Sequence, residues 1–233
     1  MNSEMANNPS VDVVAVESAR SPERSLVEEV YHAILLRIIR GEFPDGHELK
    51  STHIARELGV SRTPVVQALS RLAADGIVVQ QRNQRAIVRP GAENWLMEVH
   101  ELRILLEPQA ASNAARSMPD DVFHELRELS QRAAPRDDDA WFEDARAYDY
   151  ALHLAIAENC GNLPLGETIR KCWGFKRISY VAGADSREAL EQGYRDHLAI
   201  LAALSARDGE AAYAAVLFHL RSASLVRPAG RII

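Results

Sequence analysis

Four polar residues in the C-terminal half of the chain could together bind a divalent metal ion. Asp149 and His153 stand four positions apart in one apolar helical stripe, so their side chains reach the same point. His197 and His219 are the polar members of two further stripes of helical spacing. A carboxylate and three imidazoles inside a helical bundle are costly unless they are paired or coordinated. This donor set suits Zn²⁺, Ni²⁺, Mn²⁺ or Fe²⁺, and a buried hydrogen-bond network is the alternative.

Arg103 is the polar residue of another stripe and is expected to point inward. Its apolar neighbours at helical spacing are Leu96, Val99, Leu106 and Ala110. A buried guanidinium either clamps a carboxylate ligand or pairs with a nearby acid, here Glu107 one turn away. We favour a small carboxylate effector as its partner. Trp173, Phe175 and Arg177 are candidates for the lining of the same cavity, although aromatics at helical spacing are more often part of the core.

Six segments of helical periodicity would position these residues. They cover about residues 93–117, 119–134, 138–159, 163–182, 186–206 and 209–226, separated by breaks rich in Pro, Gly and Asp. Each segment carries one apolar stripe, which predicts an all-α bundle. We therefore expect a linker at 91–93 and an all-helical domain at 94–228 that binds the metal and the effector and forms a dimer.

The N-terminal part has the pattern of a winged helix-turn-helix over residues 25–90, so the fold is expected to be mainly α. An amphipathic helix over 26–40 precedes a short helix over 51–58, which Gly59 ends because glycine adopts the left-handed conformation without strain. Ser61 is a good N-cap for the next helix, and Pro64 suits its first turn. Two β-branched runs, 77–79 and 86–88, predict the hairpin of the wing.

Charge is distributed unevenly along the chain. The net charge is −6 over 233 residues, yet the stretch from Gly59 to Pro90 holds five arginines and one aspartate. A basic recognition helix and wing on an acidic body predict one DNA-binding face rather than a general affinity for polyanions. The second helix of such a motif normally enters the major groove. The expected DNA-binding residues are Ser61, Arg62, Thr63, Gln67 and Arg71 of that helix and Arg82 and Arg85 of the wing.

The N-terminal motifs resemble the DNA-binding domain of the GntR family of bacterial transcription regulators. The resemblance covers roughly residues 26–88 and is carried by RGEFPDG at 40–46, IARELGVSRTPV at 54–65 and ALSRL at 68–72. The family usually has Arg and Glu where this chain has Val66 and Gln67, Glu near Ser51, and Gly at the wing tip, here Asn83-Gln84. These departures concern the operator sequence that is recognised.

The C-terminal motifs are similar to the FCD ligand-binding domain of one large GntR subfamily. They are YDYALHLAIAENCGN at 148–162, RDHLAI at 195–200 and FHL at 218–220. The resemblance implies that Asp149, His153, His197 and His219 bind a divalent metal. It also implies that Arg103, in ELRILLE at 101–107, helps to bind an acidic effector. Six helices match the shorter branch of the subfamily better than its seven-helix branch.

The composition of the sequence indicates the cellular compartment in which the protein is expected to act. The sequence has no run of 18 apolar residues and no pattern of a signal peptide, so we expect no membrane span and a cytoplasmic location. Residues 1–24 are polar and are expected to form a disordered tail. Cys160 and Cys172 make no metal or redox motif and are expected to be buried fillers of a core.

These features predict a ligand-responsive transcription regulator, a repressor, that binds a near-palindromic operator as a homodimer. One alternative is a constitutive DNA-binding protein whose bundle only dimerises. The other is a metalloenzyme on a helical bundle, which is disfavoured because the sequence has no HExxH motif and no obvious general base besides the ligands. We therefore expect the protein not to be an enzyme.

Overall fold

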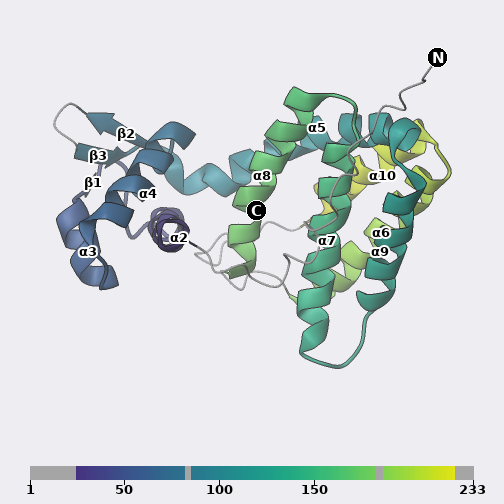
Figure 1. Ribbon diagram of the computed structural model, residues 1–233, viewed down its shortest axis with the longest axis horizontal. Helices are drawn as coiled ribbons and strands as arrows, with labels where there is room; N and C mark the ends of the chain where they lie inside the picture. Colours follow the sequence, from purple (N-terminus) through teal and green to yellow (C-terminus); the bar gives the residue numbers. More distant parts are fainter. Residues whose placement is uncertain (1–24, 82–84, 182–185, 224–233) are drawn as a thin grey trace, which may run out of the picture.

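The chain folds into a small N-terminal unit and a larger helical bundle that lie side by side, with helix α5 leading from one to the other (Figure 1). The computed structural model describes residues 25–81, 85–181 and 186–223. The expected tail at 1–24, the wing residues Arg82 and Asn83 and the last expected residues of the bundle lie outside the described residues.

The N-terminal unit is a winged helix. Its helices and strands are α2 Leu26–Ile39, β1 Glu48–Leu49, α3 Ser51–Leu58, α4 Arg62–Asp75, β2 Val78–Gln81 and β3 Arg85–Val88. The strands form an antiparallel sheet in the order β1-β3-β2, with Ile87 opposite both Glu48 and Val79. The predicted helices and hairpin are confirmed. Strand β1 was not predicted, because two residues are too few to show an alternating pattern.

Turn chemistry sets the ends of the two helices of the helix-turn-helix. Gly59 ends α3 at a φ of 66°, in the left-handed region that glycine enters without a Cβ clash. Ser61 is the N-cap of α4, as predicted, but its side chain makes no capping hydrogen bond. The exposed Ser61 hydroxyl therefore stands at the start of the recognition helix with its bonding capacity uncommitted to the cap.

The core of the winged helix extends into the bundle. Its centre packs α2 against α4 through Ile34, Leu35, Val65 and Leu72, all at most 1 % exposed. Three residues of the bundle helix α8 complete the same apolar cluster, namely Cys172, Phe175 and Ile178. The two units therefore share buried apolar surface, which is the dominant stabilising contribution in such contacts.

The bundle begins after the short helix η1 Ala92–Asn94. It consists of α5 Trp95–Ser117, α6 Asp120–Arg132, α7 Ala140–Glu158, α8 Leu163–Val181, α9 Arg187–Ser205 and α10 Gly209–Ser222. The six predicted helices are confirmed over the described residues. Helix α10 starts against α5, where a Cβ at Gly209 would lie 2.9 Å from the carbonyl oxygen of Ser112, so glycine permits this close approach.

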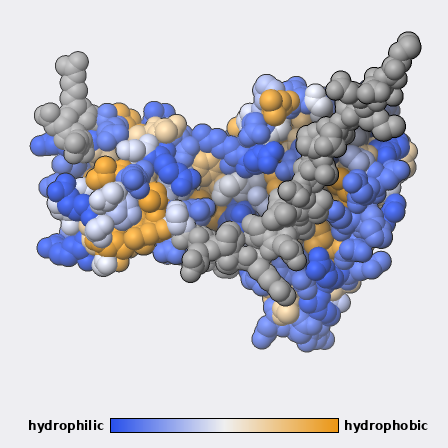
Figure 2. All heavy atoms as spheres, in the orientation of Figure 1, coloured by the Kyte–Doolittle hydropathy of each residue, from blue (hydrophilic) through white to orange (hydrophobic). Residues whose placement is uncertain are grey.

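Large aromatic side chains fill the centre of the bundle. Tyr148 and Trp173 are fully buried among alanines and leucines of the neighbouring helices. Trp141 is fully buried at the start of α7, where its indole N–H donates to the carbonyl oxygen of Ala133 at 2.9 Å. Hydrophilic side chains cover most of the face shown in Figure 2, and apolar side chains gather visibly on the N-terminal unit. Among the described helices, none is both long and apolar enough to cross a membrane.

Candidate metal centre and nucleic-acid interface

Three helices bring the four predicted metal ligands together. Asp149 and His153 lie one turn apart on α7, His197 lies on α9 and His219 on α10. One donor atom from each residue lies within 4.8 Å of all the others. Asp149 Oδ1 is 3.1 Å from His197 Nε2 and 3.7 Å from His153 Nε2, and the Nε2 atoms of His197 and His219 are 3.1 Å apart. The sequence expectation of a single cluster therefore agrees with the geometry.

Two carboxylates outside the cluster orient two of its imidazoles. Glu107 Oε2 lies 2.5 Å from His153 Nδ1, and Asp196 Oδ2 lies 3.3 Å from His219 Nδ1. Each imidazole therefore turns its Nε2 into the cluster, that of His153 towards Asp149 Oδ1 and that of His219 towards His197 Nε2. The Nε2 atom of His153 is buried and has no hydrogen-bond partner among the described residues. A buried polar atom without a partner is costly, and a metal ion at this point would satisfy it.

Burial lowers the pKa of two cluster histidines, His153 and His219, and so favours the neutral form that metal ligation requires. Burial lowers the pKa of His219 to about 3, and the neighbouring His197 adds to the shift. Burial likewise lowers the pKa of His153, against the opposing effect of Glu107. For Asp149, burial alone would raise the pKa, but the hydrogen bond with His197 and the proximity of the His197 and His153 rings hold it well below its usual range. Neutral His153 and His219 beside an ionised Asp149 offer donor atoms to a cation.

Asp149 lies at the edge of the cluster rather than at its centre. Its side chain is 13 % exposed, whereas that of His153 is fully buried. The hydroxyl of Tyr180, on α8, donates a hydrogen bond to Asp149 Oδ2, the oxygen that does not face His153 or His197. The carboxylate is thus held with one oxygen towards the imidazoles and the other towards a phenol.

Arg103 is buried, as the sequence predicts, and its charge is already paired. Its Nε donates to Glu107 Oε1 at 2.5 Å, and its guanidinium lies over the Trp173 ring at 4.1 Å. The Trp173 ring lies against His153, with ring centroids 4.8 Å apart and planes tilted by 33°, so it borders the metal cluster. Arg177 is exposed, lies over the Tyr150 ring and borders a cavity between the two units. Of the three expected effector residues, two thus lie beside the cluster and Arg177 faces a different cavity.

Sequence reasoning missed Glu107 and Asp196 as partners of the cluster histidines. Glu107 was considered only as a partner of Arg103, since helical spacing shows nothing of the contact with His153, 46 residues away. Asp196 appeared only within the RDHLAI motif at 195–200 and was given no role. The sequence offered one sign that Asp196 has partners: it stands four residues after Gln192, whose amide donates to Asp196 at 2.8 Å.

The recognition helix α4 presents its N-terminal face to solvent. Ser61, Arg62, Thr63 and Gln67 are all exposed, as is Val66, which is 39 % exposed. Polar and basic side chains at this end of α4 suit contacts with base edges and phosphates. The geometry thus places four of the seven expected DNA-binding residues on one free surface.

The remaining expected DNA contacts are placed differently. Arg71 lies over the Tyr31 ring, with its guanidinium 4.8 Å from the ring centre, and borders the cavity between the units. Arg85, at the start of β3, is exposed and lies 3.6 Å from Glu48 Oε1. Arg82 lies outside the described residues.

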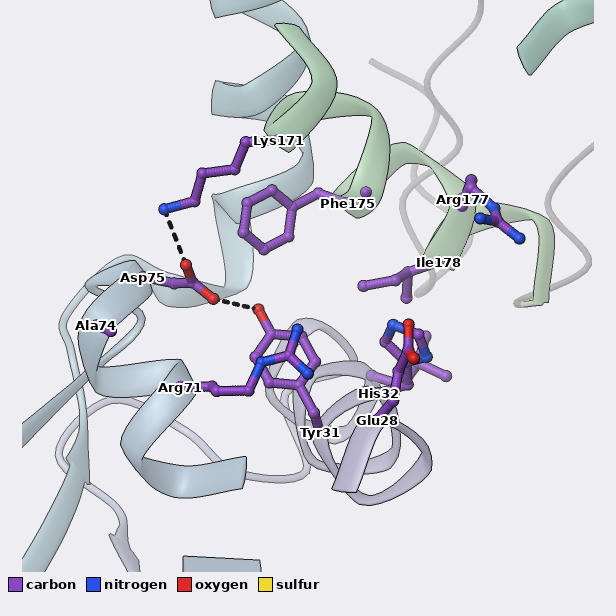
Figure 3. A pocket seen from close by; sticks show the side chains of 12 residues that line it. Glu28, Tyr31, His32, Arg71, Ala74, Asp75, Lys171, Phe175, Arg177 and Ile178 are labelled. Carbon is purple, nitrogen blue, oxygen red and sulfur yellow. Dashed lines mark hydrogen bonds and ion pairs between the residues drawn. The ribbon is translucent and has the colours of Figure 1, made fainter. Parts of the chain in front are cut away.

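A cavity of about 340 Å³ separates α2 and α4 from α8 (Figure 3). Asp75, at the end of α4, closes one side of it by contacting both units. Its carboxylate accepts a hydrogen bond from the Tyr31 hydroxyl at 2.7 Å and forms an ion pair with Lys171 of α8 at 2.9 Å. The ion pair with Lys171 thereby joins the recognition helix to the bundle.

Comparison with known proteins identifies both parts of the chain. Residues 26–88 match the family of bacterial regulatory proteins named gntR, and residues 98–222 match the FCD domain. The chain belongs to the GntR family and carries an FCD domain. Members of this family are DNA-binding transcription regulators rather than enzymes, so the expectation of a metalloenzyme alternative is set aside.

Relatives agree with this assignment. An HTH-type transcriptional regulator from Agrobacterium vitis is 39 % identical over 89 residues, which are 38 % of this chain and 52 % of that protein. A probable D-xylose utilization operon transcriptional repressor from Paenarthrobacter nicotinovorans is 29 % identical over 87 % of this chain and 89 % of that protein. The solved structure of Escherichia coli McbR/YncC has the same fold, with a TM-score of 0.59 at 24 % identity, covering 84 % of this chain and 94 % of that one.

Proposed function

We propose that this GntR-family regulator is a metal-dependent, ligand-responsive repressor that acts in the cytoplasm. In this proposal Asp149, His153, His197 and His219 hold one divalent ion. The proposal rests chiefly on the inward Nε2 atom of His153, which is buried without a partner among the described residues and lies 3.7 Å from Asp149 Oδ1. Some FCD domains bind metals, and this chain has the donor atoms in one place.

The proposed effector is a small carboxylate. A six-coordinate divalent ion such as Mn²⁺, Ni²⁺ or Fe²⁺ with four protein ligands keeps two positions open for oxygen donors. Trp173 lies against His153 and is proposed to border the bound acid. Arg103 can take a carboxylate only in exchange for Glu107, its present partner. Arg177 is proposed as a more distant contact, because it borders the cavity between the units.

Helix α8 gives such an effector a route to the DNA-binding unit. One face of the helix carries Trp173, whose indole N–H donates to Glu107 Oε1 at 3.0 Å. The opposite face carries Phe175 and Ile178, which complete the core of the winged helix. A shift of α8 on effector binding would therefore move groups in both units. This two-sided packing supports a ligand-responsive role over a purely structural bundle.

We also propose a homodimer that reads a near-palindromic operator with two half-sites. Helices α5 and α10 pack side by side, and together they expose apolar side chains to solvent. Leu105 is 74 % exposed and Phe218 63 %, with Leu102 and Tyr213 also exposed on these helices. A second copy of the chain would cover this α5/α10 surface.

The proposed domain division is a winged helix at 25–90 and an effector and dimerisation domain at 94–228.

A second candidate is a constitutive regulator in which the cluster is a hydrogen-bond network. It is favoured by two short contacts, His197 Nε2 to His219 Nε2 and to Asp149 Oδ1, both 3.1 Å. Metal analysis of protein purified without chelator, followed by thermal shift with Zn²⁺, Ni²⁺ or Mn²⁺, separates the two. The metal proposal expects bound metal or a clear rise in Tm, and the network expects neither.

A further inference from the structure

Glu107 is a carboxylate buried in the bundle between three helices. Its side chain is 1 % exposed, and its partners are Arg103 on its own helix α5, His153 on α7 and Trp173 on α8. Arg103 Nε and Trp173 Nε1 contact Oε1 at 2.5 and 3.0 Å. His153 Nδ1 contacts the other oxygen, Oε2, at 2.5 Å. Both oxygens are thus occupied.

The chemistry of Arg103 and Trp173 determines which atom carries the hydrogen in the contact between Glu107 and His153. Arg and Trp side chains have nitrogen donors and no nitrogen acceptor, so both must donate to Oε1 of Glu107. An ionised carboxylate only accepts. The hydrogen between Glu107 and His153 must therefore sit on His153 Nδ1. In the neutral imidazole the other nitrogen, Nε2, then carries a free lone pair.

That lone pair points to the cluster. His153 Nε2 is buried, has no hydrogen-bond partner among the described residues and lies 3.7 Å from Asp149 Oδ1. A protonated Nε2 would have been free to donate to that oxygen, and a bare Nε2 cannot. The geometry on both sides of the ring therefore agrees on one tautomer.

We infer that Glu107 is a positioning residue for the metal centre and that Arg103 and Trp173 hold Glu107 in position. This inference rests on the proposed metal site. Glu107 selects the tautomer of His153 and fixes the ring so that Nε2 faces the ion. Arg103 in turn holds the Glu107 carboxylate in place through its contact with Oε1. The role of Arg103 in this chain is then to support a ligand of the ion, in addition to any contact with an effector.

The variant Glu107→Gln tests this role because the substitution is isosteric. Arg103 and Trp173 both present N–H groups at the Oε1 position, so the amide oxygen will occupy it. The amide N–H₂ then faces His153 Nδ1 and demands an acceptor there, which moves the imidazole proton to Nε2. We expect the affinity of the full-length protein for Zn²⁺, measured by competition with a chromophoric chelator, to fall by about 10–100-fold.

A matched control is Glu101→Gln, an exposed carboxylate on the same helix. It removes the same charge from α5 without touching the cluster and should leave the Zn²⁺ affinity within about twofold of the wild type. Equal affinity of Glu107→Gln and wild type would overturn the role of Glu107. Equal losses in both variants would also overturn it, because a general charge effect would then explain the result.

The tautomer itself is measurable in the unaltered, metal-free protein. The ¹⁵N chemical shifts and long-range couplings of the His153 ring should show the proton on Nδ1, and in Glu107→Gln they should show it on Nε2. A wild-type ring protonated on Nε2 would overturn the inference even if Glu107→Gln does not fold. If wild-type protein binds no Zn²⁺, the proposed metal site fails, and the ring shifts still decide whether Glu107 sets the tautomer.

Discussion

Lys171 of α8 forms an ion pair with Asp75, the last residue of the recognition helix, at 2.9 Å. The two residues belong to different units of the fold, so the contact ties the end of α4 to the bundle. Phe175, one turn further along α8, is buried in the winged-helix core and meets Trp95 edge to face. A polar and an apolar contact therefore lie side by side at the junction of the units.

The apolar contact should contribute far more to stability than the ion pair. The Lys171 side chain is 58 % exposed, so solvent screens the pair, and Lys171→Met should change the free energy of unfolding by less than about 1 kcal/mol. Phe175→Ala should cost about 3–5 kcal/mol, because it leaves a cavity between the units. Urea unfolding followed by circular dichroism measures both. A larger loss for Lys171→Met than for Phe175→Ala would contradict this ranking.

Operator binding should depend on Arg62 more than on any wing residue described. Arg62→Ala should weaken binding by about 1–3 kcal/mol if its guanidinium contacts a base edge in bidentate fashion. Arg85→Ala should act through phosphate and reduce the salt slope of log K by about 1. Gel shifts with DNA from upstream of the protein's own gene, at several salt concentrations, measure both effects.

The control for these variants is Arg127→Ala, an exposed arginine on the bundle helix α6. This variant removes a positive charge from a helix outside the winged helix, so the affinity for the operator and the salt slope should both stay unchanged. Unchanged affinity of Arg62→Ala at moderate salt would show that α4 is not placed as proposed.

The metal-free protein should lose stability as the pH falls below about 6.5, near the ordinary histidine pKa. Burial lowers the pKa of His100 to about 4, with Arg103 adding to the shift, and that of His219 to about 3. Between pH 6.5 and 4.5 the unfolded chain therefore binds protons that the folded chain does not. Each histidine then contributes a slope of up to about 1.4 kcal/mol per pH unit, with stability falling towards acid.

Thermal melts from pH 7.5 to 4.5 in chelator measure this dependence. His100→Gln should flatten the slope, because it removes one of the groups that protonate only on unfolding. Below about pH 4.5, Asp149 and Glu107 add a loss of the same sign, since each has a pKa below its ordinary value in the fold. A wild-type Tm that stays level down to pH 4.5 would show that these histidines titrate normally.

The exposed α5/α10 surface should hold two copies together. Leu105→Glu introduces a charge into the proposed interface and should shift the protein from dimer to monomer at micromolar concentration, as measured by light scattering. Leu163→Glu is the matched control, because Leu163 is 77 % exposed at the start of α8 and lies outside that surface. The proposed interface would be contradicted if the wild type were a monomer, or if Leu105→Glu and Leu163→Glu were dimeric to the same extent.

Local patterns predicted the elements and the convergence of the four ligands, because each ligand is the odd residue in its own apolar stripe. The partners of those ligands could not be predicted in the same way. Glu107 meets His153 from another helix, and only packing of α5 on α7 creates the contact. The two-sided burial of α8 was also beyond the sequence, since Trp173 and Phe175 both look like residues of one core. Pairing of Arg103 with Glu107 was an open alternative and is the arrangement found.

Metal content tests the proposed regulator most directly. Full-length protein purified without chelator should carry about one divalent ion per chain by mass spectrometry, or gain thermal stability on addition of Zn²⁺, Ni²⁺ or Mn²⁺. His197→Ala should lose the ion and the stabilisation while keeping its helical circular dichroism spectrum. Wild-type protein with no stoichiometric metal and no rise in Tm with any of the three ions would contradict the proposal and leave Asp149 and the histidines as a buried hydrogen-bond network.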